Sequence, residues 1–91
     1  MPPPAFKQAG AGDRTILFLH GIGGNRNSFD DQLSALPDGW RGLSWDMPGY
    51  GGSDPLPAMT FPALADAAVT LLDEAGAAEA VILGHSMGGM I

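Results

Sequence analysis

The sequence predicts an α/β fold, a parallel β-sheet with flanking helices arranged in three layers. A short apolar run at residues 15–19 has the character of a strand buried on both faces, and a second apolar run at residues 80–84 predicts another strand. Two other segments have the apolar spacing of amphipathic helices. The predicted order is strand, helix, strand, helix, strand, followed by the start of another helix. Alternation of this kind is typical of a parallel sheet with right-handed crossovers.

The first part of the chain predicts two strands. Residues 1–14 are rich in turn formers, and residues 6–9 are a candidate for a short edge strand. The run "TILFL" at residues 15–19 is continuous, apolar and partly β-branched. The glycine-rich stretch "HGIGGN" directly after it must end the strand.

The segment "NSFDDQLSAL" predicts the first helix. Ser28 is a candidate N-cap, with Asp31 three residues later as an acidic variant of the capping box. Phe29, Leu33 and Leu36 lie at positions i, i+4 and i+7 and form one apolar face. The proline after Leu36 is expected to end this helix.

A third strand is expected at residues 42–46, followed by the long loop "MPGYGGSDPLP". Thr60 is the predicted N-cap of the second helix, which carries a proline in its first turn and ends near Gly76. The apolar side of this helix consists of Leu64, Ala68, Leu71, Leu72 and Ala75. The run "AVILG" at residues 80–84 is the last strand.

Composition limits the possible functions. We expect residues 1–91 to form part of one domain, without linker or repeat. The net charge is −6 and the four basic residues are scattered, so nucleic acid is not an expected partner. The absence of cysteine excludes disulfides and cysteine-based zinc sites. The N-terminus lacks the pattern of a signal peptide, and no apolar run is long enough to span a membrane. We therefore expect a cytoplasmic location and no membrane contact.

The chemically most informative stretch is Gly84-His85-Ser86-Met87-Gly88, which matches G-x-S-x-G. It follows a predicted strand and precedes a predicted helix, as a nucleophile elbow requires. Side chains two residues before and after the serine would collide in so sharp a turn, so both positions favour glycine. The turn would lift the Ser86 hydroxyl above the sheet edge, and the Met87 amide would point at developing negative charge.

The loop His20-Gly21-Ile22-Gly23-Gly24 supplies a second element. Glycines let backbone amides face a ligand, and the Ile22 amide is our candidate for a second oxyanion donor. A dinucleotide fingerprint starting at Gly21 would need glycine where the chain has Arg26. The Gly-Lys-Ser/Thr of a phosphate-binding loop is absent. A merely flexible loop is the remaining alternative.

The "HGIGG" loop, the "DMPGYGGSD" segment and "GHSMGG" occur in the order and spacing found in the α/β-hydrolase superfamily. From about Thr15 to its last residue, the sequence resembles the N-terminal part of an ester- or lactone-hydrolysing member with a partial α/β-hydrolase fold. The resemblance implies that Ser86 is the nucleophile and that Ile22 and Met87 form the oxyanion hole. It also implies that the strands ending at Leu19 and Gly84 are neighbours.

A serine nucleophile needs a base and an orienting acid. In the resembling superfamily the acid and then the histidine follow the serine, so both are expected beyond Ile91. The 91-residue chain is therefore expected to be an N-terminal fragment that is nearly inactive alone and leaves the strand at residues 80–84 as an unpaired edge. His85 should point away from the hydroxyl and His20 should bond loop backbone, so neither is the expected base.

Other residues in the loops have simpler interpretations. Asp46 is expected to tie down the loop that follows it through local backbone bonds. Tyr50 is interpreted as a surface aromatic, with pocket lining as the alternative, and Trp40 and Trp45 as packing residues. Met47, Met87 and Met90 either border an apolar acyl pocket or pack against helix and loop.

The sequence thus predicts an enzyme that hydrolyses ester-like small molecules, such as carboxylic esters or lactones, through a serine acyl-enzyme, with no metal or cofactor. Carbon–carbon bond hydrolysis, haloperoxidation and acyl transfer remain alternatives on the same elbow, as does a non-catalytic remnant or binding module. Halide or epoxide opening is disfavoured, because the resembling enzymes with that chemistry carry aspartate where this chain has Ser86.

Overall fold

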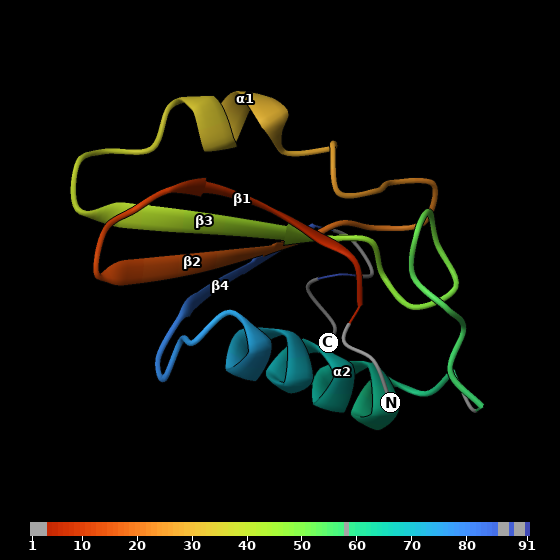
Figure 1. The fold of residues 1–91 in the computed structure, drawn as a ribbon. Helices are drawn as coiled ribbons and strands as arrows, with labels where there is room; N and C mark the ends of the chain where they lie inside the picture. The colour runs from red at the N-terminus through yellow and green to blue at the C-terminus, as the bar shows by residue number, and fades with distance from the viewer. Residues whose placement is uncertain (1–3, 58, 86–87, 89–90) are drawn as a thin grey trace.

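Four strands form one sheet in the computed structural model, which describes residues 4–57, 59–85, 88 and 91. The strands of the described chain are β1 (Phe6–Gly10), β2 (Arg14–Leu19), β3 (Trp40–Trp45) and β4 (Val81–Gly84). Their order in the sheet is β1-β3-β2-β4 (Figure 1). β2 pairs in parallel with both β3 and β4, whereas β1 pairs antiparallel with β3. The predicted edge strand is therefore present, and the parallel pattern holds for the three strands that follow it.

The helices α1 (Asp30–Ser34) and α2 (Phe61–Glu74) cover opposite faces of the sheet (Figure 1). Each lies in the connection between two parallel strands, which confirms the three-layer α/β arrangement. Alternation along β2 separates the two layers, because successive side chains of a strand point to opposite faces. Leu17 and Leu19 belong to the buried cluster that includes α2, whereas Phe18 belongs to the cluster on the side of α1.

The cluster on the side of α2 is the larger one. Its members are Leu17, Leu19, Leu43, Trp45, Met47, Leu64, Ala67, Ala68 and Leu71. Trp45 is fully buried, which confirms its interpretation as a packing residue. On the opposite face the rings of Phe18 and Phe29 stack with centroids 4.9 Å apart, and Leu33 completes that cluster. Burial of such side chains is the main source of stability of the fold.

α1 is shorter than predicted, and the predicted cap at Ser28 is wrong. The helix begins after Phe29, and no side chain caps it. Ser28 Oγ instead accepts a hydrogen bond from the Asn25 amide (2.9 Å), so the hydroxyl closes a turn before the helix. The predicted apolar face is confirmed, since Phe29 and Leu33 are buried. A Cβ on Gly42 would lie 2.6 Å from Leu33 Cδ2, so glycine there lets α1 approach the sheet.

α2 follows the prediction closely. Thr60 Oγ1 accepts a hydrogen bond from the Ala63 amide (3.2 Å), which confirms the predicted N-cap. The helix ends before Gly76, whose φ of 74° is in the left-handed region that glycine adopts at helix ends. The buried positions Leu64, Ala68 and Leu71 lie on the predicted side.

β4 lies at the edge of the described sheet, as expected for the strand at residues 80–84. Val81, Ile82 and Leu83 expose 51%, 52% and 40% of their surface. β4 pairs with β2 on one side, and no described strand pairs with its other side. An apolar run therefore lies at the edge of the four-stranded sheet of the described residues, which confirms the expected unpaired edge.

Arg41 joins β3 to β2 and to the end of α2. Its Nη1 donates to the carbonyl of Ala75 (2.8 Å), and Nη2 and Nε donate to Thr15 Oγ1 at 3.1 and 3.3 Å. A cation at this position also interacts favourably with the negative, carbonyl end of the α2 dipole. The side chain thus stabilises the position of α2 on the sheet.

We expect Arg41→Met to lower the free energy of unfolding by about 1.5–3 kcal/mol, because it removes charged hydrogen bonds from partly buried acceptors. Lys7→Met is the matched control. It removes the exposed ion pair between Lys7 Nζ and Asp30 Oδ1 (2.6 Å), worth at most about 1 kcal/mol. Chemical denaturation of the expressed protein measures both. Equal effects of the two substitutions would contradict the role assigned to Arg41.

Candidate active site

Three loops follow the carboxyl ends of β2, β3 and β4 at one edge of the sheet (Figure 1). Leu19 pairs with Gly84 at the end of β2 and β4. The His85 amide then donates to the Leu19 carbonyl (3.0 Å), which continues the pairing by one residue. The expectation that these two strands are neighbours is confirmed. Ligands of open α/β sheets bind at such a carboxyl edge.

Gly88, four residues after the end of β4, lies close against the backbone at the end of β2. A Cβ on Gly88 would lie 2.2 Å from the Leu19 carbonyl oxygen and 2.7 Å from that of His20, distances that real side chains do not reach. The Gly88 amide donates to the His85 carbonyl (3.0 Å). Glycine at position 88 is therefore required by close backbone approach, as the elbow interpretation predicts. Ser86 and Met87 lie outside the described residues.

The loop after β2 contains a tight turn around Ile22. The Gly24 amide donates to the Gly21 carbonyl (3.0 Å), and Gly23 has a φ of 83°, so glycine suits this third turn position. A Cβ on Gly24 would lie 2.7 Å from His20 Cβ. The Ile22 side chain is 77% exposed. None of the hydrogen bonds between described residues uses the Ile22 amide, the predicted oxyanion donor.

His20 is buried beneath this turn and bonded through both ring nitrogens. Nε2 accepts from the Met47 amide (3.0 Å), so Nδ1 carries the proton and donates to the Gly21 carbonyl (2.8 Å). The expectation that His20 bonds loop backbone is confirmed. Because both nitrogens already hold backbone groups, the ring is a structural link between two loops and is not available as a general base.

Asp46, directly after β3, is buried and accepts two backbone hydrogen bonds. Oδ2 accepts from the Gly52 amide (2.9 Å), which confirms the expected role in the loop after β3. Oδ1 accepts from the Arg26 amide (2.7 Å), a contact that sequence reasoning missed. These partners are far apart in the chain, and only the pairing of β2 with β3 brings them together. The carbonyl of Asp46 also accepts from the Ser53 hydroxyl.

Two other loop residues pack inward. Tyr50 is partly buried against the cluster on the side of α2, with its ring centroid 5.4 Å from that of His20, so the surface interpretation is wrong. Met47 is fully buried in the same cluster, which supports packing over pocket lining. Trp40 is partly buried, and the guanidinium of Arg14 lies 5.8 Å from its ring centroid. Met90, like Met87, lies outside the described residues.

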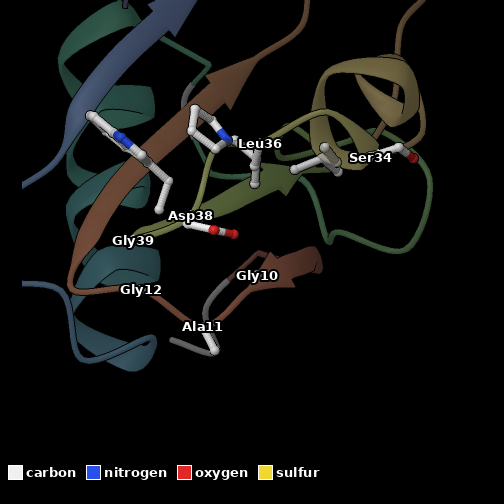
Figure 2. Close-up of a pocket in the computed structure, with 10 residues that line it drawn as sticks. Gly10, Ala11, Gly12, Ser34, Leu36, Asp38 and Gly39 are labelled. Atoms are coloured by element: carbon white, nitrogen blue, oxygen red, sulfur yellow. The ribbon is translucent and has the colours of Figure 1, made fainter.

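A hollow of about 440 Å³ lies at the opposite edge of the sheet. It is bounded by the β1–β2 turn (Gly10, Ala11, Gly12) and by the segment from Ser34 to Gly39 that leads into β3 (Figure 2). It is therefore not part of the candidate site. Among the described residues no group of three or more His, Cys, Asp or Glu is arranged to hold a metal ion. Neither α-helix in this part of the chain has the length and apolarity of a membrane span.

A family model described as alpha/beta hydrolase fold matches residues 14–91. The chain belongs to the alpha/beta hydrolase family. It is 36% identical over 85 residues to the dihydrolipoyllysine-residue acetyltransferase component of an acetoin cleaving system from Cupriavidus necator, covering 92% of this chain and 23% of that protein. It is 35% identical over 78 residues to a pimeloyl-[acyl-carrier protein] methyl ester esterase from Neisseria meningitidis, covering 86% and 29%.

Solved structures of alpha/beta hydrolases superimpose on the same region. A thermophilic esterase from Thermogutta terrifontis has a TM-score of 0.84 at 33% identity, covering 93% of this chain and 32% of that one. An epoxide hydrolase from Vigna radiata has a TM-score of 0.84 at 28% identity, covering 93% and 29%. The chain spans less than a third of the length of these relatives.

We expect Gly88→Ala to lower the free energy of unfolding by more than about 2 kcal/mol, because the methyl group would overlap the Leu19 carbonyl. Gly76→Ala is the control. This substitution also replaces a glycine, but the added methyl group would have no neighbour within 4 Å. The left-handed φ of residue 76 costs an alanine about 1–2 kcal/mol. Thermal denaturation of the two variants tests the comparison, and a Gly88→Ala protein as stable as the wild type would refute the close backbone contact.

Proposed function

We propose that the protein containing this chain hydrolyses ester-like small molecules through a serine acyl-enzyme. Ser86 attacks the substrate carbonyl, the amides of Ile22 and Met87 bind the oxyanion, and water releases the acyl group. The observation that carries the proposal is the contact of Gly88 with the backbone of Leu19 and His20. This contact supports a position of Ser86 close to the loop that holds Ile22, since Gly88 is only two residues after Ser86.

The geometry around the turn supports the assignment from two sides. His85 is bonded to the Leu19 carbonyl, and Gly88 lies against the carbonyls of Leu19 and His20. Ser86 and Met87 are covalently between these two contacts, and Ile22 follows closely after His20 in the chain. Acyl transfer needs a nucleophile and two amide donors around one carbonyl, and this edge of the sheet is where the chain can bring them together.

The catalytic acid and histidine are proposed to follow Ile91 in that order. His20 is committed to backbone bonds, and the chain spans less than a third of the relatives' length. The 91 residues alone are then expected to turn over substrate poorly, since loss of the base lowers kcat by a factor on the order of 10⁶ in a serine hydrolase. The expected partner is a small acyl substrate, and the cytoplasmic location remains a prediction.

The relatives favour acyl chemistry. One named relative is a methyl ester esterase and one solved neighbour is an esterase. The acetyltransferase relative supports a second candidate, acyl transfer, in which the same acyl-enzyme is released to an acceptor other than water. Epoxide opening remains disfavoured despite the epoxide hydrolase neighbour, because Ser86 stands where the resembling enzymes carry aspartate.

The test uses the full-length protein, a fluorophosphonate probe and p-nitrophenyl esters of increasing acyl length. We expect covalent labelling and ester hydrolysis in the wild type and neither in Ser86→Ala, with kcat reduced by about 10⁴-fold or more. Ser53→Ala is the matched control, since Ser53 is a buried serine whose hydroxyl bonds the Asp46 carbonyl and should not react.

Labelling that persists in Ser86→Ala, or a wild type that neither labels nor hydrolyses any ester, would refute the proposal. An added alcohol, amine or thiol acceptor distinguishes the second candidate. Acyl transfer would appear as acylated acceptor formed in preference to free acid.

A further inference from the structure

The loop from His20 to Arg26 is held at both ends by two consecutive residues. At its start, His20 Nε2 accepts from the Met47 amide (3.0 Å). At its end, the Arg26 amide donates to Asp46 Oδ1 (2.7 Å). Ile22, the proposed oxyanion donor, lies between these two attachments. The position of its amide therefore depends on the short segment that directly follows β3.

Asp46 is itself firmly fixed. It is 2% exposed, and its amide donates to the Ala5 carbonyl (2.8 Å) while its own carbonyl accepts from the Ser53 hydroxyl. Its second carboxylate oxygen accepts from the Gly52 amide (2.9 Å), and a Cβ on Gly51 would lie 2.4 Å from that oxygen. The carboxylate therefore cannot rotate away without breaking bonds that no water can easily replace.

The backbone bond, and not the ion pair, is the important contact with Arg26. Arg26 Nε lies 3.7 Å from Asp46 Oδ2 and the Arg26 side chain is 45% exposed, so this pair contributes little. A backbone amide bonded to a buried carboxylate is short and charge-assisted, and such bonds are about twice as strong as neutral ones. It fixes the chain shortly after Ile22.

We propose that Asp46 is a positioning residue for the oxyanion hole, acting through the Arg26 amide on the Ile22 amide. This inference rests on the function proposed above. Asp46 does not touch the substrate. Its carboxylate holds the far end of the loop, so that the Ile22 amide already faces the oxyanion before the reaction begins and no loop ordering is required in the transition state.

The experiment compares Asp46→Asn and Ser53→Ala in the full-length protein. An asparagine side chain keeps the size of the aspartate but replaces one acceptor oxygen with a donor, so that the Arg26 and Gly52 amides could not both be bonded. Ser53→Ala removes the hydrogen bonds of the Ser53 hydroxyl to the Asp46 carbonyl and from the Ala5 amide, and it leaves the carboxylate unchanged. The two variants therefore perturb the same residue, but only one alters the loop attachment.

We expect Asp46→Asn to lower kcat for an activated ester by about 10- to 100-fold with KM changed less than about threefold, because oxyanion stabilisation acts mainly in the transition state. The inhibition constant of a boronic acid, which mimics the tetrahedral intermediate, should rise by a similar factor. Amide hydrogen exchange of residues 21–26 should accelerate. In Ser53→Ala kcat and the inhibition constant should stay within about threefold of wild type, even where the melting temperature falls equally.

Two results would overturn the inference. One is an Asp46→Asn protein with a lower melting temperature but unchanged kcat, inhibition constant and exchange at residues 21–26, which would make Asp46 purely structural. The other is a parallel loss of kcat in both variants. Failure of the proposed function would look different, since the wild type would then neither label nor hydrolyse esters. The exchange measurement still tests the loop attachment in that case, and unchanged exchange would refute it.

Discussion

The carboxyl end of β2 is the point on which the candidate site depends. Leu19 pairs with Gly84 on one side, its carbonyl accepts the His85 amide, and Gly88 lies directly against it. Because β2 lies between β3 and β4, the loops that follow all three strands meet at one edge of the sheet. If β2 and β4 paired one residue out of register, Gly88 would no longer lie against the backbone of Leu19 and His20, where the loop that contains Ile22 begins.

The loops at this edge are held mainly by backbone groups bonded to a few buried polar side chains. His20 and Asp46 each bond two main-chain groups, and the loop glycines allow the backbone to approach them. This arrangement satisfies polar groups that would otherwise be costly to bury. It also explains why the site can be rigid although it is built from turns. Rigid placement of amide donors is what stabilisation of an oxyanion requires.

Much of the fold could be predicted from local patterns. The apolar runs of β2 and β4, the cap at Thr60 and the glycine end of α2 depend on short-range chemistry, and the structure confirms them. The cap at Ser28 was wrong because Asn25 and Ser28 bond the amides of the turn before the helix, and local pattern does not decide which amides such side chains take.

Other features depend on contacts between distant parts of the chain. The exposure of β4 depends on which strands pair with it, and the apolar character of its residues does not decide this. The bond between Asp46 and Arg26 could not be predicted, since it exists only once β2 and β3 are paired. The roles of Ser86, Ile22 and Met87 stay predictions.

Because Met47 is buried, the cores on the two faces of the sheet differ in how directly they are connected to the candidate site. Met47 packs in the cluster beneath α2, and its amide is the group that anchors His20. In the cluster beneath α1, the main chains of the described members Phe18, Phe29 and Leu33 do not bond the side chains of His20 or Asp46. We therefore expect a void near α2 to displace the loops at the carboxyl edge more than a void of equal size near α1, which should mainly lower stability. Core substitutions beneath α1 should consequently be tolerated better than core substitutions beneath α2.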